Sequence, residues 1–197
     1  MKQIVIASRN DGKVREIRNF LHGLDFDIKS ISDFPHIPDI NEDGKTFEEN
    51  AFLKAKSIFE QTKITTIADD SGLEVHYLDN RPGIYSKRYS GENANDLSNN
   101  MKLLDELKNV DMDNRRARFK CSIVLYNSLY NGLSFEGKCD GYIIDDMKGD
   151  NGFGYDPLFI PVGYNKTFAE LDLVTKNKIS HRGKALTHLR DFLEKVF

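Results

Sequence analysis

Short apolar runs alternate in this sequence with longer stretches whose apolar residues recur every three or four positions. The run at residues 3–7 predicts a buried strand, and the apolar residues between Val14 and Leu24 have the spacing of a helix. Residues 26–31 predict a second strand, and residues 33–45, which are acidic and contain prolines, predict a loop. Strands that alternate with helices in this way restrict the fold to a sheet covered by helices.

The same alternation continues in the next part of the chain. Thr46 and Glu49 have the spacing of a capping box at the start of a helix. Residues 64–68 and 73–78 are rich in apolar residues and predict two strands, separated by a polar turn at residues 69–72. Such a turn would place acidic side chains at the end of a buried strand.

A long hairpin is predicted in the second half of the chain. Strands are expected at residues 118–126 and 133–144, and Asn131-Gly132 is a dipeptide typical of hairpin turns. Ser180 is a natural N-cap for a last helix. Because no repeat or linker interrupts this order, we expect one domain over residues 1–197, an α/β fold with a mixed β-sheet and flanking helices.

Length and composition exclude several classes of protein. A chain of 197 residues can bury roughly 70% of the surface that its unfolded form exposes, so it needs neither disulfides nor metal to fold. The net charge of −3 gives no basic footprint for bulk nucleic-acid binding. No apolar stretch reaches the roughly 18–20 residues of a membrane span. Two cysteines and no signal-peptide pattern predict a cytoplasmic protein. The net charge and the short apolar stretches predict that it has neither nucleic-acid nor membrane partners.

The first candidate site segment joins the first predicted strand to the first predicted helix and consists of Ser8, Arg9, Asn10, Asp11, Gly12 and Lys13. A strand–loop–helix junction presents free backbone N–H groups and the positive end of the helix dipole, which suit phosphate. Gly12 allows a tight turn, Asn10 can donate from its amide, and Lys13 supplies a charge. The segment matches neither the Walker nor the Rossmann glycine pattern, and an ordinary turn with a solvated lysine is the alternative.

Two adjacent carboxylates, Asp69 and Asp70, follow the apolar run at residues 64–68. Uncompensated acids at such a position are costly, and Mg²⁺ is commonly held by one or two carboxylates together with substrate phosphates. Successive strand residues point to opposite faces, so at most one of the two carboxylates would face a given site unless the turn rotates the chain. Glu42, in the acidic loop, is a candidate second ligand. The alternatives are a solvated turn and a solvated Glu42.

Two further segments suit a flat, polar ligand. The first interleaves aromatic residues with glycine and ends in an acceptor: Phe153, Gly154, Tyr155 and Asp156. Aromatic core residues beside a turn would give the same pattern. The second segment contains Lys176, His181 and Arg182, whose donors near the predicted start of the last helix fit ligand oxygens. A solvated basic helix start is the alternative.

Six segments together resemble one family of proteins. SRNDGK, TFEENAFLKAK, IADDSGLEV, PGIYSKRYSG, NGFGYDPLF and NKISHRGKAL occur in the order found in the inosine triphosphate pyrophosphatase family, from residue 4 to about residue 187. The resemblance implies a homodimer whose subunits have an elongated mixed sheet and two α/β lobes around a substrate cleft. It also implies hydrolysis of dITP, ITP and XTP to a nucleoside monophosphate and pyrophosphate, which removes deaminated purines from the nucleotide pool.

The resemblance further implies roles for individual residues. Ser8 to Lys13 would bind the triphosphate, with arginine at position 9 where many relatives have a small residue. Asp70 would be the catalytic proton acceptor and, with Glu42 or its neighbour Asp43, would hold one Mg²⁺ per subunit. Further substrate contacts would come from Ser71, Phe153, Gly154, Tyr155, Asp156, Lys176, His181 and Arg182.

In this reaction water would attack the α-phosphorus, and Mg²⁺ would neutralise phosphate charge and lower the pKa of its bound water. One alternative is a related pyrophosphatase that acts on methylated or pyrimidine nucleotides. Another, from a different class, is a nucleotide-binding sensor that does not hydrolyse. The adjacent Asp69 and Asp70 disfavour the sensor, because carboxylates beside phosphates are repelled unless a metal lies between them.

Overall fold

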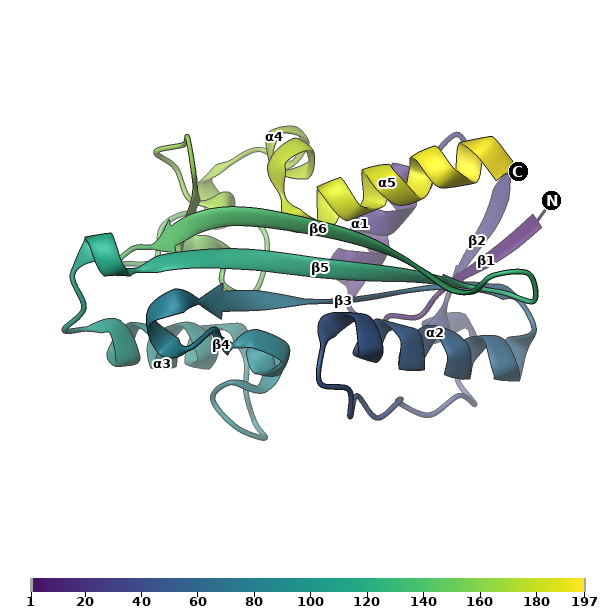
Figure 1. The fold of residues 1–197 in the computed structure, drawn as a ribbon, viewed down its shortest axis with the longest axis horizontal. Coiled ribbons are helices and arrows are strands. Elements are labelled where there is room, and N and C mark those ends of the chain that lie inside the picture. The colour runs from purple at the N-terminus through teal and green to yellow at the C-terminus, as the bar shows by residue number, and fades with distance from the viewer. Residues whose placement is uncertain (1, 197) are drawn as a thin grey trace. The chain divides into compact units, whose positions relative to one another are not determined.

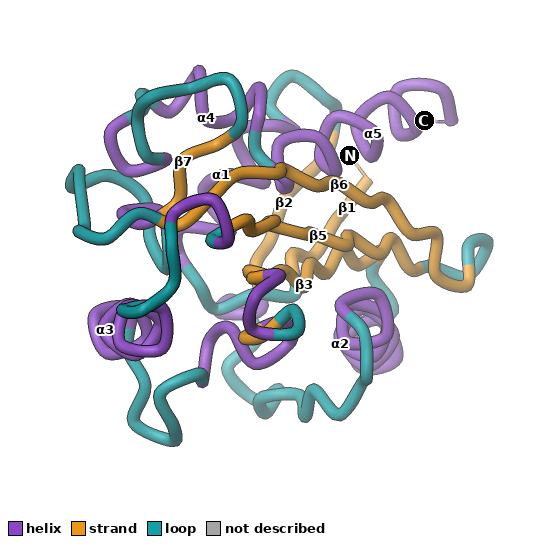
Figure 2. Tube along the Cα trace, turned by 60° about the vertical axis from the view of Figure 1, so that its left-hand side comes forward, coloured by secondary structure: helices purple, strands orange, loops and turns teal. Residues whose placement is uncertain are grey.

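The first strand explains how the chain builds two layers of helices. Val5 points to one face of β1 (Lys2–Ile6), and Ile4 and Ile6 point to the other, because side chains alternate along a strand. Ile4 and Ile6 pack with α1 (Asp11–Leu21) and with the C-terminal helix α5 (His181–Val196). Val5 packs with α2 (Phe47–Thr62). Figures 1 and 2 show α2 and α5 on opposite sides of the strands.

The computed structural model describes residues 2–196, and these residues form two compact units. Unit 1 contains the described residues up to Asp70, residues 121–136, and the described residues from Ala185 onward. Unit 2 contains Ser71–Lys120 and Gly137–Lys184. Three strands and the last helix therefore contribute residues to both units.

The strands of unit 1 are partly parallel. Strand β1 pairs in parallel with β2 (Phe26–Ser30) and with the start of β3 (Thr65–Val75). The unit also contains the end of β5 (Arg116–Tyr126) and the start of β6 (Asn131–Ile143). Its core lies on both faces of these strands, since Ile67 belongs to the cluster with α1 and Ala68 to the cluster with α2.

Unit 2 is built on antiparallel pairs. Strand β4 (Arg81–Pro82) pairs with the end of β3, and β7 (Phe159–Pro161) pairs with β6. Its helices are α3 (Asp96–Leu107) and α4 (Leu173–Ile179). The core is aromatic, and the Phe119 ring lies 4.7 Å from that of Phe159 in an edge-to-face contact.

The sheet combines parallel and antiparallel neighbours, so the prediction of a mixed sheet with flanking helices is confirmed. The strand order is β2-β1-β3-β5-β6-β7, with β4 paired to β3. None of the helices within residues 2–196 is both long enough and apolar enough to cross a membrane.

The structure corrects two of the sequence predictions. Strand β3 runs without interruption through residues 69–72, so the predicted turn between two strands is wrong. The hairpin of β5 and β6 is confirmed, but its turn lies at residues 127–130, and Asn131 and Gly132 already belong to β6. The Asn127 side chain forms the turn, because its Oδ1 accepts from the backbone N–H groups of the two residues before Asn131.

Candidate active site

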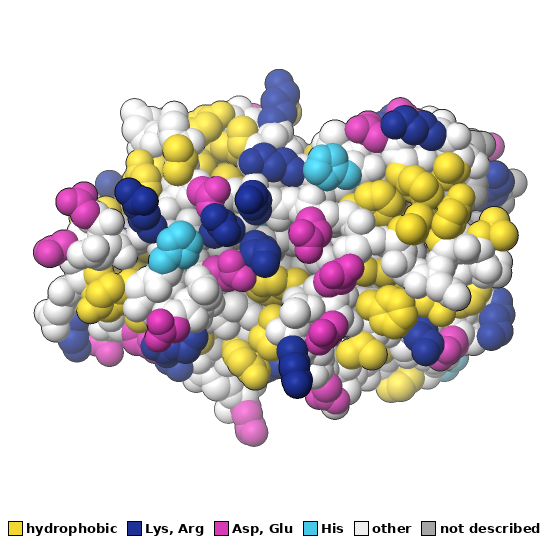
Figure 3. All heavy atoms as spheres, viewed as in Figure 1, with side chains coloured by type: hydrophobic (Ala, Val, Ile, Leu, Met, Phe, Trp, Pro, Cys, Tyr) yellow, Lys and Arg dark blue, Asp and Glu magenta, His cyan; other side chains and the backbone are white. Residues whose placement is uncertain are grey.

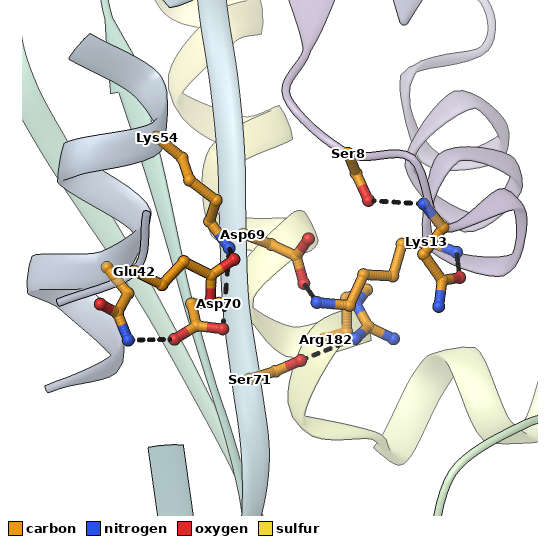
Figure 4. Close-up of polar contacts among 10 residues, drawn as sticks. Ser8, Lys13, Glu42, Lys54, Asp69, Asp70, Ser71 and Arg182 are labelled. Carbon is orange, nitrogen blue, oxygen red and sulfur yellow. Dashed lines mark hydrogen bonds and ion pairs between the residues drawn. The ribbon is translucent and has the colours of Figure 1, made fainter. Parts of the chain in front are cut away.

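Asp69 and Asp70 are consecutive residues of β3 and therefore point to opposite faces of unit 1. Asp69 Oδ2 lies 2.9 Å from Nζ of Lys13, which is on α1. Asp70 Oδ1 lies 3.7 Å from Nζ of Lys54, which is on α2. Each carboxylate thus meets a lysine from the helix on its own side (Figure 4). These two lysines explain how adjacent buried acids remain inside a strand.

The predicted phosphate segment lies at the start of α1. Asn10 is the N-cap of this helix, and its Oδ1 accepts from the backbone N–H of Lys13 at 3.0 Å. The backbone N–H of Asn10 donates to Ser8 Oγ, and Asp11 occupies the first helical turn. Gly12 is the second residue of α1, so the tight turn expected of it is not present. The N-terminal end of α1 retains the dipole that favours an anion.

Arg9 bonds to the acidic loop that precedes α2. Its Nε donates to Asp39 Oδ1 at 2.7 Å, and its Nη2 donates to the backbone oxygen of Ile37, also at 2.7 Å. Two of the three guanidinium nitrogens, Nε and Nη2, are therefore engaged within the chain. The segment at residues 8–13 and the acidic loop are held together through this side chain.

Glu42 approaches Asp70 through a shared lysine. Glu42 Oε1 lies 3.1 Å from Lys54 Nζ, so this ammonium group contacts both Glu42 and Asp70. The neighbouring Asp43 accepts instead from the Asn41 side chain. Of the two acidic residues, Glu42 is thus the one that the structure brings to Asp70.

The start of α2 holds this loop in place. Thr46 is the N-cap, and its Oγ1 accepts from the backbone N–H of Glu49 at 3.1 Å. Glu49 Oε2 accepts from the backbone N–H of Lys45 rather than from that of Thr46. The predicted capping box is therefore only half formed, because the Glu49 carboxylate bonds one residue earlier in the loop.

Burial changes the proton affinity of the central groups in unit 1. It raises the pKa of the Asp70 carboxyl above its ordinary value, and the nearby lysines only partly offset this effect. Burial alone would lower the pKa of the Lys54 ammonium, but the surrounding carboxylates, Asp70 foremost, raise it above its ordinary value. Lys54 therefore stays protonated, and Asp70 is a stronger base than a solvated aspartate.

The donor set around Lys54 fits a divalent cation that also binds phosphate. Carboxylate oxygens of Glu42 and Asp70 converge on one ammonium nitrogen, a position already suited to positive charge. Magnesium is usually held by one or two carboxylates together with substrate phosphates. Among residues 2–196 no cluster of three or more His, Cys, Asp or Glu side chains is suited to a metal ion. Glu42 and Asp70 supply two carboxylates of the kind that magnesium uses, and substrate phosphates would supply further ligands.

A second polar cluster lies in unit 2 and is built around Asp156. Asp156 Oδ2 accepts from Lys176 Nζ at 2.7 Å and from the backbone N–H of Phe153 at 2.9 Å. Gly152 has a φ of +81°, and a Cβ there would lie only 2.1 Å from Asp156 Oδ2, so only glycine fits. The carboxylate thus closes the turn that carries Phe153.

Two cations lie near the Phe153 ring. Lys176 Nζ is 5.1 Å and Arg182 Cζ is 5.3 Å from the ring centroid. Arg182 Nη2 also donates to Ser71 Oγ at 2.8 Å, as Figure 4 shows. The His181 ring stacks on Phe119 with centroids 4.7 Å apart.

Helix α5 starts as predicted. Ser180 Oγ accepts from the backbone N–H of Gly183, so the predicted N-cap of α5 is confirmed.

Helix α3 holds the turn that carries the aromatic residues. The backbone N–H of Gly154 donates to Asp96 on α3, and the backbone oxygen of Gly154 accepts from Asn100 on the same helix. The hydroxyl of Tyr155 donates to a backbone oxygen, and its side chain packs in the core of unit 2.

The structure thus gathers the predicted residues into two groups. In unit 1, Lys54 brings Glu42 and Asp70 together, and Lys13 pairs with Asp69 on the other face of β3. In unit 2, a second group contains Ser71, Phe153, Asp156, Lys176 and Arg182. Sequence reasoning missed Lys54 and Asn50, which both contact Asp70. Their spacing of four residues on a predicted helix was the available signal.

Two basic side chains of β5 are paired with acids. Figure 3 shows Lys and Arg side chains interleaved with acidic ones over β5 and β6. Arg118 pairs with Asp140, and Lys120 pairs with Glu74. The charges of Arg118 and Lys120 are therefore locally balanced.

Comparison with known proteins defines the class to which this fold and these clusters belong. Residues 4–192 match the model of the Ham1 family, and the chain belongs to that family. Two solved structures share its fold. The Ham1 protein of Staphylococcus aureus has a TM-score of 0.89 and 44% identity, and covers 98% of this chain and 99% of its own. A HAM1 protein of Coxiella burnetii has a TM-score of 0.92 and 40% identity over the whole of both chains.

Curated relatives have more specific names. The chain is 50% identical to the dITP/XTP pyrophosphatase of Geobacter sulfurreducens, over 98% of this chain and 97% of that protein. It is 47% identical to the dITP/XTP pyrophosphatase of Bacillus licheniformis over the full length of both. The family resemblance predicted from the sequence is confirmed.

Proposed function

We propose that this protein hydrolyses the non-canonical purine nucleoside triphosphates dITP, ITP and XTP to nucleoside monophosphate and pyrophosphate. The observation that carries the proposal is the buried Asp70, whose carboxylate shares Lys54 with Glu42. A basic carboxylate next to a cation position suits hydrolysis of a phosphoanhydride. The names of relatives at 47% and 50% identity support the choice of substrate.

Each group of unit 1 has a distinct task in this proposal. Lys13 and the N-terminal end of α1 bind the phosphates, since a lysine and a helix dipole both favour anions. Asp70 accepts a proton from the water that attacks the α-phosphorus, and pyrophosphate leaves with the electrons of the broken P–O bond. A divalent cation held by Glu42 and Asp70 would neutralise charge on the phosphates.

The residues of unit 2 are proposed to bind the base and the sugar. Arg182 carries only donors, and His181 can donate from a ring nitrogen, so both suit the 6-keto oxygen of hypoxanthine or xanthine. Asp156 and Lys176 keep the turn of Phe153 in place, in addition to the substrate contacts predicted for them.

A substrate panel tests the proposed function. We expect pyrophosphate release from dITP, ITP and XTP in the presence of Mg²⁺, little release from ATP or from methylated and pyrimidine triphosphates, and none with EDTA. A protein that binds dITP without releasing pyrophosphate would instead be the nucleotide sensor considered above. Preference for a methylated or pyrimidine triphosphate would favour the other enzyme class.

Arg182→Ala tests the reading of the base. Loss of its donors should lower the ITP rate strongly and the low ATP rate little, so that the ratio of the two rates narrows. Arg190→Ala is the matched control, because Arg190 lies on the same helix and bonds to Glu194 and to backbone oxygens of residues 20 and 22, away from the predicted site residues. A constant ratio in Arg182→Ala would make Arg182 a phosphate-binding or structural residue.

Mg²⁺ as the cation, a homodimer and a cytoplasmic location complete the proposal. Family membership supports the cation and the dimer. The sequence composition supports the location and the absence of nucleic-acid and membrane partners, which is also part of the proposal. Light scattering on the purified protein tests the dimer. Replacing Mg²⁺ with Ca²⁺ or Mn²⁺ in the pyrophosphate assay tests the choice of cation.

A further inference from the structure

We propose that Asn50 is a positioning residue that fixes Asp70 and the Glu42 loop to each other. The proposal rests on the function proposed above, because it concerns the two carboxylates assigned to the cation. No individual role for Asn50 was predicted from the sequence, although Asn50 lies within one of the six quoted segments. It lies in the first turns of α2 and is completely buried, with 0% of its surface exposed.

Both ends of the Asn50 amide are bonded, and to different parts of unit 1. Its Nδ2 donates to Asp70 Oδ2 at 3.0 Å, and its Oδ1 accepts from the backbone N–H of Gly44 at 2.8 Å. A neutral amide is suited to this double task, because it offers a donor and an acceptor on one planar group. One side chain therefore links strand β3 to the loop before α2.

The bond to Asp70 selects which carboxylate oxygen remains for other partners. Asn50 and Lys54 are four residues apart on α2 and share one face of the helix. Asn50 takes Oδ2 of Asp70, and Lys54 lies near Oδ1. Rotation of the carboxylate would break the bond to Asn50. Oδ1 is thus kept on the side of the ammonium group that also contacts Glu42.

The bond to Gly44 fixes the loop that carries Glu42. Gly44 is two residues after Glu42 and approaches α2 so closely that a Cβ there would lie 2.7 Å from Asn50 Oδ1. The same Cβ would lie 2.8 Å from the Cβ of Glu49. The absence of a side chain at Gly44 is therefore a condition for the bond to Asn50.

A purely structural asparagine would affect stability alone, whereas a positioning residue would also affect cation affinity. Mn²⁺ binding to the protein without nucleotide, measured by isothermal titration calorimetry, distinguishes the two. Asn50→Ala should raise the dissociation constant of Mn²⁺ about 10–100-fold, as is typical for residues that orient metal ligands. In the pyrophosphate assay kcat should fall more than KM for dITP rises, since the nucleotide contacts remain.

Two more variants make the result specific. Gly44→Ala places a Cβ against Asn50 and Glu49 and should displace the loop while keeping the Asn50 side chain, so it should weaken Mn²⁺ binding in the same direction but less. Asn127→Ala is the matched control, because Asn127 is a buried asparagine of the same unit with two hydrogen bonds in the β5–β6 turn. It should lower the unfolding temperature and leave the Mn²⁺ affinity unchanged.

The outcomes separate this inference from the proposed function. Wild-type affinity for Mn²⁺ in folded Asn50→Ala, or no Mn²⁺ binding by the wild-type protein, overturns the positioning role. If Asn50→Ala does not fold, Gly44→Ala decides, and unchanged Mn²⁺ affinity in that variant overturns the role as well. A wild-type protein that binds Mn²⁺ but releases no pyrophosphate from dITP refutes the proposed function, while the titrations still decide the role of Asn50.

Discussion

Lys176 and Asp156 in unit 2 form a closed ion pair, whereas Lys54 in unit 1 is divided between two carboxylates. The side chains of Lys176 and Asp156 are 7% and 5% exposed, and their charged atoms lie 2.7 Å apart. Lys54 lies 3.7 Å from Asp70 and 3.1 Å from Glu42, whose side chain is 32% exposed. Both arrangements combine a buried lysine with a buried aspartate. In unit 1 the lysine also contacts a second carboxylate, which is partly exposed.

The difference indicates two uses of the same pair of residue types. Asp156 Oδ2 accepts from Lys176 Nζ and from the backbone N–H of Phe153, so the pair stabilises a turn. Asp70 shares its lysine with a partly exposed glutamate, and burial raises its pKa. A satisfied pair supports the chain, whereas a pair that shares one cation among several acids can accept another ligand.

The largest expected effect is on stability and concerns the closed pair. Asp156→Asn removes the carboxylate that pairs with the buried Lys176 and should lower the free energy of unfolding by about 3–5 kcal/mol. Urea denaturation followed by circular dichroism measures this value. Asp140→Asn is the control, since its pair with Arg118 is half exposed and should contribute at most about 1 kcal/mol. Equal losses in both variants would remove the distinction between the two clusters.

The next effect is on catalysis and concerns the divided lysine. Asp70→Asn should lower kcat by at least about 100-fold, because the base and a cation ligand are lost together. The change is nearly isosteric, and Lys54 keeps Glu42 as a partner, so the protein should still fold. Initial rates of pyrophosphate release from dITP measure the loss. Full activity would show that Asp70 is not the proton acceptor.

The smallest expected effect is a shift in the unfolding temperature on adding Mg²⁺. At ten times its dissociation constant, a ligand stabilises the folded state by about 1.4 kcal/mol. For a chain of this size that corresponds to about 3–6 °C. The shift should occur in the wild-type protein and in Asp156→Asn, and be absent from Asp70→Asn. A shift that is lost in Asp156→Asn but kept in Asp70→Asn would place the cation at Asp156 and refute its assignment to Asp70.

Features that depend on neighbouring residues could be predicted from the sequence. Short-range patterns predict the start of α1 after β1, the hairpin of β5 and β6, and the Ser180 cap. The turn predicted at Asp69 and Asp70 was wrong, because their lysine partners come from α1 and α2. Isolated acids after an apolar run resemble a turn, and only the packed helices show that their charges are compensated.

The unpredicted site residues illustrate the same limit. Asn50 and Lys54 are polar residues on an amphipathic helix, and such residues are usually solvated. Their burial follows from the way α2 packs against the strands, with Ala51 and Ala55 as the small contacts. Spacing alone places the two side chains on one face, but which face meets Asp70 depends on tertiary packing.

Because β3 is continuous, an insertion or deletion within it must contain an even number of residues to keep each side chain on its own face. One residue inserted or deleted between Ile67 and Asp69 would exchange the sides of the two aspartates, because strand side chains alternate. Asp70 would then face α1 and Asp69 would face α2, and each would meet the other's lysine. Changes of two residues would preserve the sides. This strand can therefore change in length only in even steps without reversing which aspartate faces which helix.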